Sequence, residues 1–184
     1  MAHLTASVEY GIHCLLLLAG RDERPASGRD LAQFQGVSPS FVAKIFSRLE
    51  KAGIVEASEG IRGGYRLARS PDQITVLAIV DAIEGRKPLF ECQDIRERCA
   101  LFSGCPPNWA TRGVCSIHAV MLQAEKAMRD VLADRSLADL NASVERTAPA
   151  SFGIDTKEWF DRRVDLRGTS RQAGAAGRSR GRRQ

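Results

Sequence analysis

The stretch VSPSFVAKIFSRLEKAGIVEASEGIRGGYRLAR, residues 37–69, has the pattern of a helix followed by a β-hairpin. Ser38 is a favoured helix-capping residue, and Pro39 suits the first helical position because its missing N–H would be unpaired there in any case. The helix is expected to run to about residue 52. Apolar residues four apart predict one buried stripe along it, namely Phe41, Ile45 and Leu49.

Two short strands are expected directly after this helix, at residues 54–58 and 65–68. The turn between them, EGIRGG, supplies glycines for positive backbone angles. Further back in the chain, a capping-box-like start at Ser27 predicts a short helix to about Gln35. The apolar spacing of residues 5–19 predicts another helix before it.

Downstream of the hairpin, a helix is expected over residues 75–84, capped by Thr75 and ended by Gly85. The order of helix, turn, helix and basic hairpin is typical of a winged helix-turn-helix. We therefore expect a mainly α fold with a small β-hairpin wing. Residues 1–85 would form the winged helix-turn-helix domain, which suggests a DNA-binding protein.

In this geometry the helix over residues 39–52 would enter the major groove. The stretch from residue 44 to residue 69 holds six Lys and Arg against three Glu, a local basic strip of the kind that phosphate contact needs. The residues expected at DNA are Ser38, Ser40 and Lys44 at the groove, Arg48 near the phosphate backbone, and Arg62, Gly63 and Gly64 on the wing. The alternative is that these are ordinary solvated residues on a surface helix and hairpin.

Four of the five cysteines lie in the segment ECQDIRERCALFSGCPPNWATRGVC, namely Cys92, Cys99, Cys105 and Cys115. Their long spacings differ from the CxxC pairs of zinc ribbons and thioredoxin sites. Longer gaps suit a loop that wraps a bulkier inorganic cluster, and thiolates are the usual ligands of iron–sulfur clusters. The alternative is that some of these thiols pack as small hydrophobes, as we expect for Cys14 in the apolar run of residues 12–19.

The chain has 184 residues, of which 43% are hydrophobic, enough for one domain with appendages. No apolar run approaches the length of a membrane span, and the segment before residue 12 lacks a secretory charge pattern. We therefore expect a cytoplasmic protein without a membrane partner, in which thiols stay reduced. The net charge of +5 resides in the tail 167–184, which holds six Arg and no acid.

A long amphipathic helix is expected from Ser116, with apolar residues at spacings of three and four. It has more apolar surface than a small domain needs, so we expect it to pair with a second copy in a symmetric dimer. Residues 86–115 would form a cysteine-rich, cluster-binding loop. Residues 116–147 would form the dimerisation helix and a short last helix, and residues 148–184 a flexible, Arg-rich tail. This tail would add nonspecific DNA affinity or remain a solvated appendage.

Four segments together resemble the Rrf-two-type winged-helix iron–sulfur regulators, which include the IscR, NsrR, RirA and RsrR repressors. These segments are LTASVEYGIHCLLLLA, the stretch quoted first, ITVLAIVDAIEG and the cysteine loop. The resemblance covers about residues 3–145. It implies a homodimeric bacterial transcription factor, most simply a repressor, that binds double-stranded DNA at a palindromic operator. Its DNA affinity would respond to the presence or oxidation state of an iron–sulfur cluster that senses redox state, iron or nitric oxide.

The resemblance implies two possible ligand sets. In the first, Cys92, Cys99 and Cys105 hold a four-iron four-sulfur cluster, with Glu9 of the other subunit as the fourth ligand. In the second, Glu9 and His13, four residues apart on one helix, join Cys105 and Cys115 of the partner subunit around a two-iron two-sulfur cluster. The first gap between cysteines is longer than usual for the four-iron set, and the insertion PPNWATRGV departs from it, so the two-iron set is favoured.

Two other functions remain open at this point. The same cysteines could serve a metal-free, thiol-based redox regulator. The domain could also be a zinc-stabilised winged-helix module that acts through protein contacts. An enzyme is not expected, because the sequence has no P-loop, no G-x-S-x-G motif and no evident acid–base pair.

Overall fold

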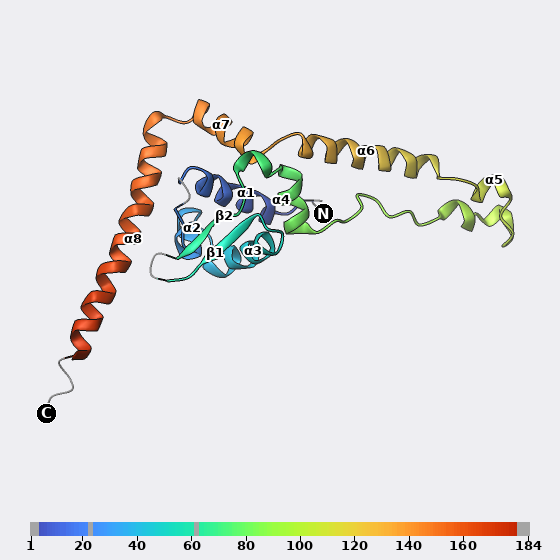
Figure 1. Ribbon diagram of the computed structural model, residues 1–184. Coiled ribbons are helices and arrows are strands. Elements are labelled where there is room, and N and C mark those ends of the chain that lie inside the picture. Colours follow the sequence, from blue (N-terminus) through green and yellow to red (C-terminus); the bar gives the residue numbers. More distant parts are fainter. Residues whose placement is uncertain (1–3, 22–23, 61–62, 180–184) are drawn as a thin grey trace.

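The computed structural model describes residues 4–21, 24–60 and 63–179. Residues 4–85 form a body of four helices and one hairpin, and this body matches the predicted order (Figure 1). Its elements are α1 (Ala6–Ala19), α2 (Gly28–Phe34), α3 (Pro39–Lys51), β1 (Val55–Ser58), β2 (Gly64–Leu67) and α4 (Val76–Glu84). A short 3-10 turn, Pro71–Gln73, precedes α4.

The helices of the body begin where the sequence predicts because each start has its own capping side chain. The Ser27 hydroxyl accepts the N–H of Asp30 at 3.1 Å, and the Thr75 hydroxyl accepts the N–H of Ala78 at 3.1 Å. Each satisfies an amide that has no partner within its helix. These contacts are local in sequence, so the residue pattern alone is sufficient to place them.

The core of the body lies between α1, α3 and α4. On α3 the buried side chains include Ile45 and Leu49, as predicted, and also Val42 and Phe46. Phe41 is only half-buried, and its ring meets that of Tyr10 edge-on with 5.5 Å between centroids. The buried face is therefore wider than the predicted stripe, because α3 packs against α1, α2 and α4 together.

The hairpin pairs antiparallel from Val55 opposite Leu67 to Ser58 opposite Gly64. Tyr65 extends this ladder to the chain before α2, where it exchanges two backbone hydrogen bonds with Ala26, of 2.8 and 3.0 Å. Strand β2 is thereby bonded on both edges, to β1 and to the segment before α2.

A long arm leaves the body after α4 (Figure 1). It runs outward through two 3-10 turns (Ile95–Arg98 and Ala100–Phe102) and α5 (Asn108–Thr111), and returns along α6 (Ser116–Ala133). No residue within α6 is buried. The arm is therefore in contact with the body only near its inner end.

The short helix α7 (Leu137–Thr147) follows the arm and returns the chain to the body. The Ser136 hydroxyl and the Asp139 carboxylate form a reciprocal capping box at its start. Leu137 is fully buried, and its N–H donates to the carbonyl of Ile74 at 2.8 Å. The predicted last short helix is confirmed.

The last helix, α8 (Ala150–Ser179), differs from the predicted flexible tail over residues 148–184. Phe160 of α8 is 1% exposed and its ring stacks on that of Phe34, with 5.5 Å between centroids. The prediction of loose structure is wrong for residues 150–164, because one aromatic pair, Trp159 and Phe160, supplies enough apolar surface to dock this part of α8 on the body. The expected disorder of residues 167–184 stays a prediction, because the side chains beyond residue 164 are not described and residues 180–184 lie outside the described chain. No helix in the described ranges is long and apolar enough to cross a membrane.

Candidate nucleic-acid interface and cysteine segment

The amino-terminal end of α3 presents polar side chains at the surface. Ser38, Ser40 and Lys44 are all exposed. The Ser38 hydroxyl accepts the N–H of Phe41 at 3.2 Å and lies 3.2 Å from the hydroxyl of Ser40. Hydroxyls donate and accept hydrogen bonds, and an ammonium donates, so this end of α3 can bond to base edges or phosphates.

Lys44 differs from the arginines of the basic strip that the structure describes, because each of these arginines has a partner within the protein. Arg66 is paired with Glu56 across the hairpin at 2.6 Å, and the Arg69 guanidinium donates to the Gly53 carbonyl at 3.1 Å. Lys44 forms no ion pair with any residue that the structure describes. Its charge is therefore available to a phosphate or a base edge.

Arg48 has a partner within the protein. Its guanidinium donates a hydrogen bond to the carbonyl of Ile83, in the last turn of α4. Sequence reasoning assigned Arg48 to the DNA backbone only, because a bond to a carbonyl 35 residues away leaves no sequence signal. The structure gives Arg48 a role within the fold, which is to hold α3 against α4, while its contact with the DNA backbone stays a prediction.

The wing glycines are required by the hairpin itself. A Cβ at Gly64 would lie 2.4 Å from the carbonyl oxygen of Ala26, and one at Gly63 would lie 2.3 Å from that of Ser58. Both distances are too short for any side chain. The predicted reason, close approach of the wing to a duplex, stays a prediction. Arg62 lies outside the described residues.

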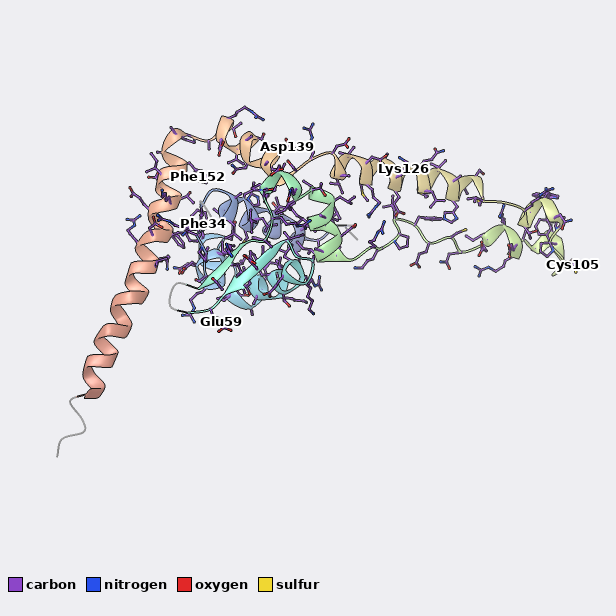
Figure 2. The ribbon with its side chains drawn as sticks, viewed as in Figure 1. Phe34, Glu59, Cys105, Lys126, Asp139 and Phe152 are labelled. Atoms are coloured by element: carbon purple, nitrogen blue, oxygen red, sulfur yellow. The ribbon has the colours of Figure 1, made fainter. Side chains whose placement is uncertain are left out.

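The cysteine segment lies far out on the arm, and Figure 2 shows Cys105 at its tip. The thiols of Cys92, Cys99 and Cys115 are half-exposed and that of Cys105 is exposed. All are free. By contrast Cys14 is buried in the core, and this burial raises the pKa of its thiol to about 12. The prediction that Cys14 is a core residue is confirmed.

Cys115 occupies the residue just before α6. The backbone N–H groups of His118 and Ile117, in the first turn of α6, lower the pKa of the Cys115 thiol, because exposed helix amides stabilise a negative charge. The thiolate is the form that binds metals. The loop before Cys115 is held in shape by Arg96, which donates to the carbonyl of Gly113 and, at 3.5 Å, to that of Thr111.

Glu9 and His13 lie exposed on α1, beside an open groove of about 500 Å³. Apolar side chains including Leu4 and Ile12 line the rest of this groove. In the described parts of the chain, no three His, Cys, Asp or Glu side chains are close enough together to hold a metal ion. The thiolate, carboxylate and imidazole donors suit an iron–sulfur cluster chemically. Within one chain, however, the cysteines at the arm tip and the pair on α1 stay apart (Figures 1 and 2).

The last turn of α4 connects the arm to the body. Asp81 accepts two hydrogen bonds from Arg129 of α6, at 2.9 and 2.7 Å. One turn later, the Glu84 carboxylate accepts the N–H of Thr5 at 3.1 Å and its hydroxyl at 2.5 Å. The Thr5 hydrogen bond lowers the pKa of Glu84. Arg48 of α3 bonds to the same turn. The end of α4 therefore contacts three helices: α3 with its exposed polar end, α1 with Glu9 and His13, and α6, which follows the cysteine segment.

A family model described as Rrf2, iron-dependent transcriptional regulator, matches residues 4–143. The chain is 35% identical over 138 residues to protein rrf2 of Nitratidesulfovibrio vulgaris, covering 74% of this chain and 85% of that protein. It is 31% identical to the transcriptional regulator NsrR of Geobacillus kaustophilus, covering 74% of this chain and 88% of that protein.

Two solved structures share the fold. The structure of T. potens IscR superposes with a TM-score of 0.61 at 25% identity, covering 81% of this chain and 93% of that one. CymR, the global cysteine regulator of B. subtilis, gives a TM-score of 0.62 at 24% identity, covering 78% of this chain and 98% of that one. These likenesses confirm the predicted winged helix-turn-helix fold.

Proposed function

The chain belongs to the Rrf2 family of DNA-binding transcriptional regulators, and we propose that it is a homodimeric repressor whose affinity for a palindromic operator depends on an iron–sulfur cluster. The family and the relatives are regulators of transcription and not enzymes. One observation carries the proposal: four free thiols lie in the arm segment between α4 and α6, with Cys105 at its tip, away from the α1 helix that would complete their ligand set (Figure 2).

DNA recognition is assigned to α3. Ser38, Ser40 and Lys44 occupy its exposed amino-terminal end, and the helix is fixed to the body by a buried face and by Arg48. A rigid helix with a polar end suits insertion into a major groove, where hydroxyl and ammonium groups read base edges.

Dimerisation is assigned to α6. Its apolar side chains Ile117, Val120 and Val131 are 63%, 60% and 65% exposed. Apolar surface in this amount favours burial against a partner, and a second copy of α6 offers a self-complementary face. Since the cysteine segment is attached to α6, crossing two such helices would bring it toward the partner's body.

The favoured ligands are Glu9 and His13 of one subunit with Cys105 and Cys115 of the other. Two features support this set: the groove beside Glu9 and His13 is open, and the pKa of Cys115 is lowered toward the thiolate. A set of Cys92, Cys99 and Cys105 with Glu9 remains the second possibility. When bound, the cluster would supply a redox-active centre.

The chain's own contacts offer a path from the cysteines to α3. Arg129 on α6 bonds to Asp81 on α4, and Arg48 on α3 bonds to the neighbouring Ile83 carbonyl. A change in the direction of α6 would therefore be transmitted through α4 to α3. In a dimer this would alter the distance between the two recognition helices and hence the fit to the operator.

Anaerobic native mass spectrometry tests the proposal directly. We expect a dimer that carries iron and sulfide, and Cys115→Ser should remove the cluster if the two-iron set is correct. Cys92→Ser is the matched control, because Cys92 belongs only to the four-iron set. Loss of the cluster in Cys92→Ser and its retention in Cys115→Ser would select the four-iron set. A dimer without iron and sulfide would contradict both.

A metal-free thiol regulator is the second candidate. The fold is shared with CymR, the global cysteine regulator of B. subtilis, and the thiols here are free and accessible. In this case anaerobic protein would be colourless, and a mild thiol oxidant would change operator affinity reversibly. Zinc without sulfide in the same mass spectrum would instead indicate a structural metal.

A further inference from the structure

The docked part of α8, residues 150–164, contacts the ends of α1 and α2. Phe160 is buried, and its ring stacks on that of Phe34, the last residue of α2. Trp159 meets the same Phe34 ring edge-on, with 5.1 Å between centroids. The guanidinium carbon of Arg21, two residues after α1, lies 4.5 Å from the centre of the Phe160 ring. The match to the family model ends at residue 143, so the family does not account for this contact.

Asp161 adds charged contacts to the segment between α1 and α2. Its carboxylate pairs with Arg21 at 3.7 Å and with Arg24 at 3.5 Å. The N–H of Arg24 donates to the carbonyl of Arg21 at 3.0 Å, and Nε of Arg21 donates to the carbonyl of Arg24 at 3.4 Å. Arg21 is 5% exposed, so protein groups stabilise its charge more than water does. Asp161 of α8 is one of these groups.

The same segment is bonded to the wing. Two residues after Arg24, Ala26 exchanges two backbone hydrogen bonds with Tyr65 of β2, of 2.8 and 3.0 Å. The ring of Tyr65 packs in turn on that of Phe46 of α3, with 4.6 Å between centroids. A continuous set of contacts therefore runs from α8 through this segment to β2 and α3.

The helix α8 thus contacts both attachments of the recognition helix α3. Ahead of α3, Phe34 ends α2 four residues before the capping residue Ser38. Behind α3 comes the hairpin, whose strand β2 is bonded to Ala26. Figure 1 shows α8 running beside α2 on the outside of the body. Removing α8 would take contacts from both attachments and leave the core between α1, α3 and α4 in place.

We propose that the docked part of α8 is a brace for DNA binding. It holds α2 and the wing in the arrangement in which α3 and the wing meet a duplex together. Phe160 and Asp161 are positioning residues, because they act through Phe34, Arg21 and Arg24. With α8 released, α2 and the wing would move more freely, and ordering them again on DNA would reduce affinity. The inference rests on the DNA-binding function proposed above.

Phe160→Ala in the full-length chain tests the brace. Phe152→Ala, at a side chain of the same helix that is 45% exposed, is the matched control. Both variants keep all six arginines of residues 167–184, so any contribution of the tail to DNA binding is equal. Fluorescence anisotropy uses an operator selected from a random-sequence pool with the wild-type protein. Phe160→Ala should lower the affinity about tenfold, a usual size for coupling between distant sites. The control should change it by less than about twofold.

Asp161→Asn is a milder variant that keeps the aromatic contacts. Asp155→Asn, at an exposed position of the same helix, removes the same charge and is its control. Losing a negative charge by itself favours binding to anionic DNA. The brace predicts the opposite for Asp161→Asn, an affinity about threefold below that of Asp155→Asn, within the range for a partly exposed ion pair. Asp161→Glu keeps the carboxylate and should bind as the wild type does.

Hydrogen exchange measures the link from α8 to the wing without DNA. The amides of Ala26 and Tyr65, which bond across the two segments, should exchange faster in Phe160→Ala than in Phe152→Ala. The amide of Ile79, in the buried face of α4, should keep its wild-type rate. Equally faster exchange at all three amides would indicate a general loss of stability and would count against the brace.

The binding results also decide between failure of the brace and failure of the DNA-binding assignment. Unchanged affinity in Phe160→Ala, or equal affinities of Asp161→Asn and Asp155→Asn, would overturn the brace. Tighter binding by Phe160→Ala would overturn it too, because α8 would then be inhibitory. If Lys44→Ala weakens binding while Phe160→Ala does not, the brace alone is rejected. If neither substitution weakens binding, the assignment of α3 to DNA fails as well.

Discussion

Arg129 of α6 is joined to Asp81 of α4 by two parallel hydrogen bonds of 2.9 and 2.7 Å. Both side chains are about a quarter exposed. This bidentate pair is a side-chain link between the cysteine arm and the body, and it sets the direction in which the arm leaves. A rigid link at the base of the arm is suited to transmit a change in the direction of α6 to α4.

Asp81→Asn should weaken this signal more than it weakens the fold. The amide keeps only one acceptor oxygen, and its NH₂ group would face a guanidinium N–H, so the bidentate pair would be broken and α6 would lose its fixed direction. We expect a ratio of about fivefold or more between operator affinities of cluster-containing and cluster-free wild-type protein, and a ratio near one in the variant. Gel-shift titration with an operator selected from a random-sequence pool gives both values. Lys126→Ala, which breaks an exposed pair within α6, should keep the wild-type ratio.

Lys44→Ala should lower operator affinity about tenfold, the cost of one good contact to a base or phosphate. Lys51→Ala is the matched control, because Lys51 lies on the same helix at the end away from Ser38. Fluorescence anisotropy with labelled operator measures both. Equal effects of the two substitutions would place the DNA elsewhere than at the amino-terminal end of α3.

Gly64→Ala should destabilise the wing by about 2 kcal/mol, because the added methyl group would overlap the Ala26 carbonyl. The substitution would lower the unfolding temperature of the protein, with or without DNA. Gly20→Ala is the control, since the nearest atom to its Cβ is at an ordinary 3.8 Å. A stable Gly64→Ala protein that has lost only DNA affinity would instead support the duplex-approach interpretation of this glycine.

Phe160→Ala should release α8 from the body at a cost of about 3 kcal/mol, typical of removing a buried aromatic ring. Trp159 would then enter water and its emission would shift to the red, while protease would cleave within residues 150–164 first. Phe152→Ala, at a side chain that is 45% exposed, should change little. Cooperative unfolding of the whole chain without early cleavage would contradict independent docking of α8.

Cys115 should remain reactive at lower pH than an ordinary thiol. Its pKa lies below the usual 9.0, because the amides of His118 and Ile117 stabilise the thiolate. As the pH is lowered, the rate of alkylation of Cys115 in the metal-free protein should therefore begin to decline at a lower pH than the rate for a thiol with the ordinary pKa of 9.0. Peptide mapping after iodoacetamide treatment provides the measurement. Cys14, with a pKa of about 12, should stay unlabelled in the folded protein.

Most of the winged domain follows from local sequence signals. Ser27, Ser38 and Thr75 cap helices through bonds to residues three positions ahead, so the pattern alone places these starts. The partner of Arg48 and the reason for Gly64 depend on chain segments far away in sequence. No local sequence pattern indicates either feature.

Two other features escaped prediction for different reasons. The docking of α8 depends on Phe34 meeting Trp159 and Phe160, and a single aromatic pair in a polar segment gives no periodic signal. The ligand set would draw on two subunits, so neither the sequence nor one folded chain brings Glu9 and His13 together with Cys105 and Cys115. Their assignment stays a prediction.

The geometry of α6 also makes the arm a lever. Its 18 residues span roughly 27 Å at 1.5 Å per residue, and its fulcrum lies near the inner end, at Arg129. The part of α6 between Arg129 and its outer end spans roughly 20 Å, so a tilt of about 5° at this fulcrum displaces the outer end by about 2 Å. Read in the opposite direction, a rearrangement of ångström size among the outer thiols becomes a rotation of a few degrees at the fulcrum. In the proposed dimer, such a rotation would change the spacing of the two DNA-reading domains, so a rearrangement far from the duplex would alter the fit to the operator.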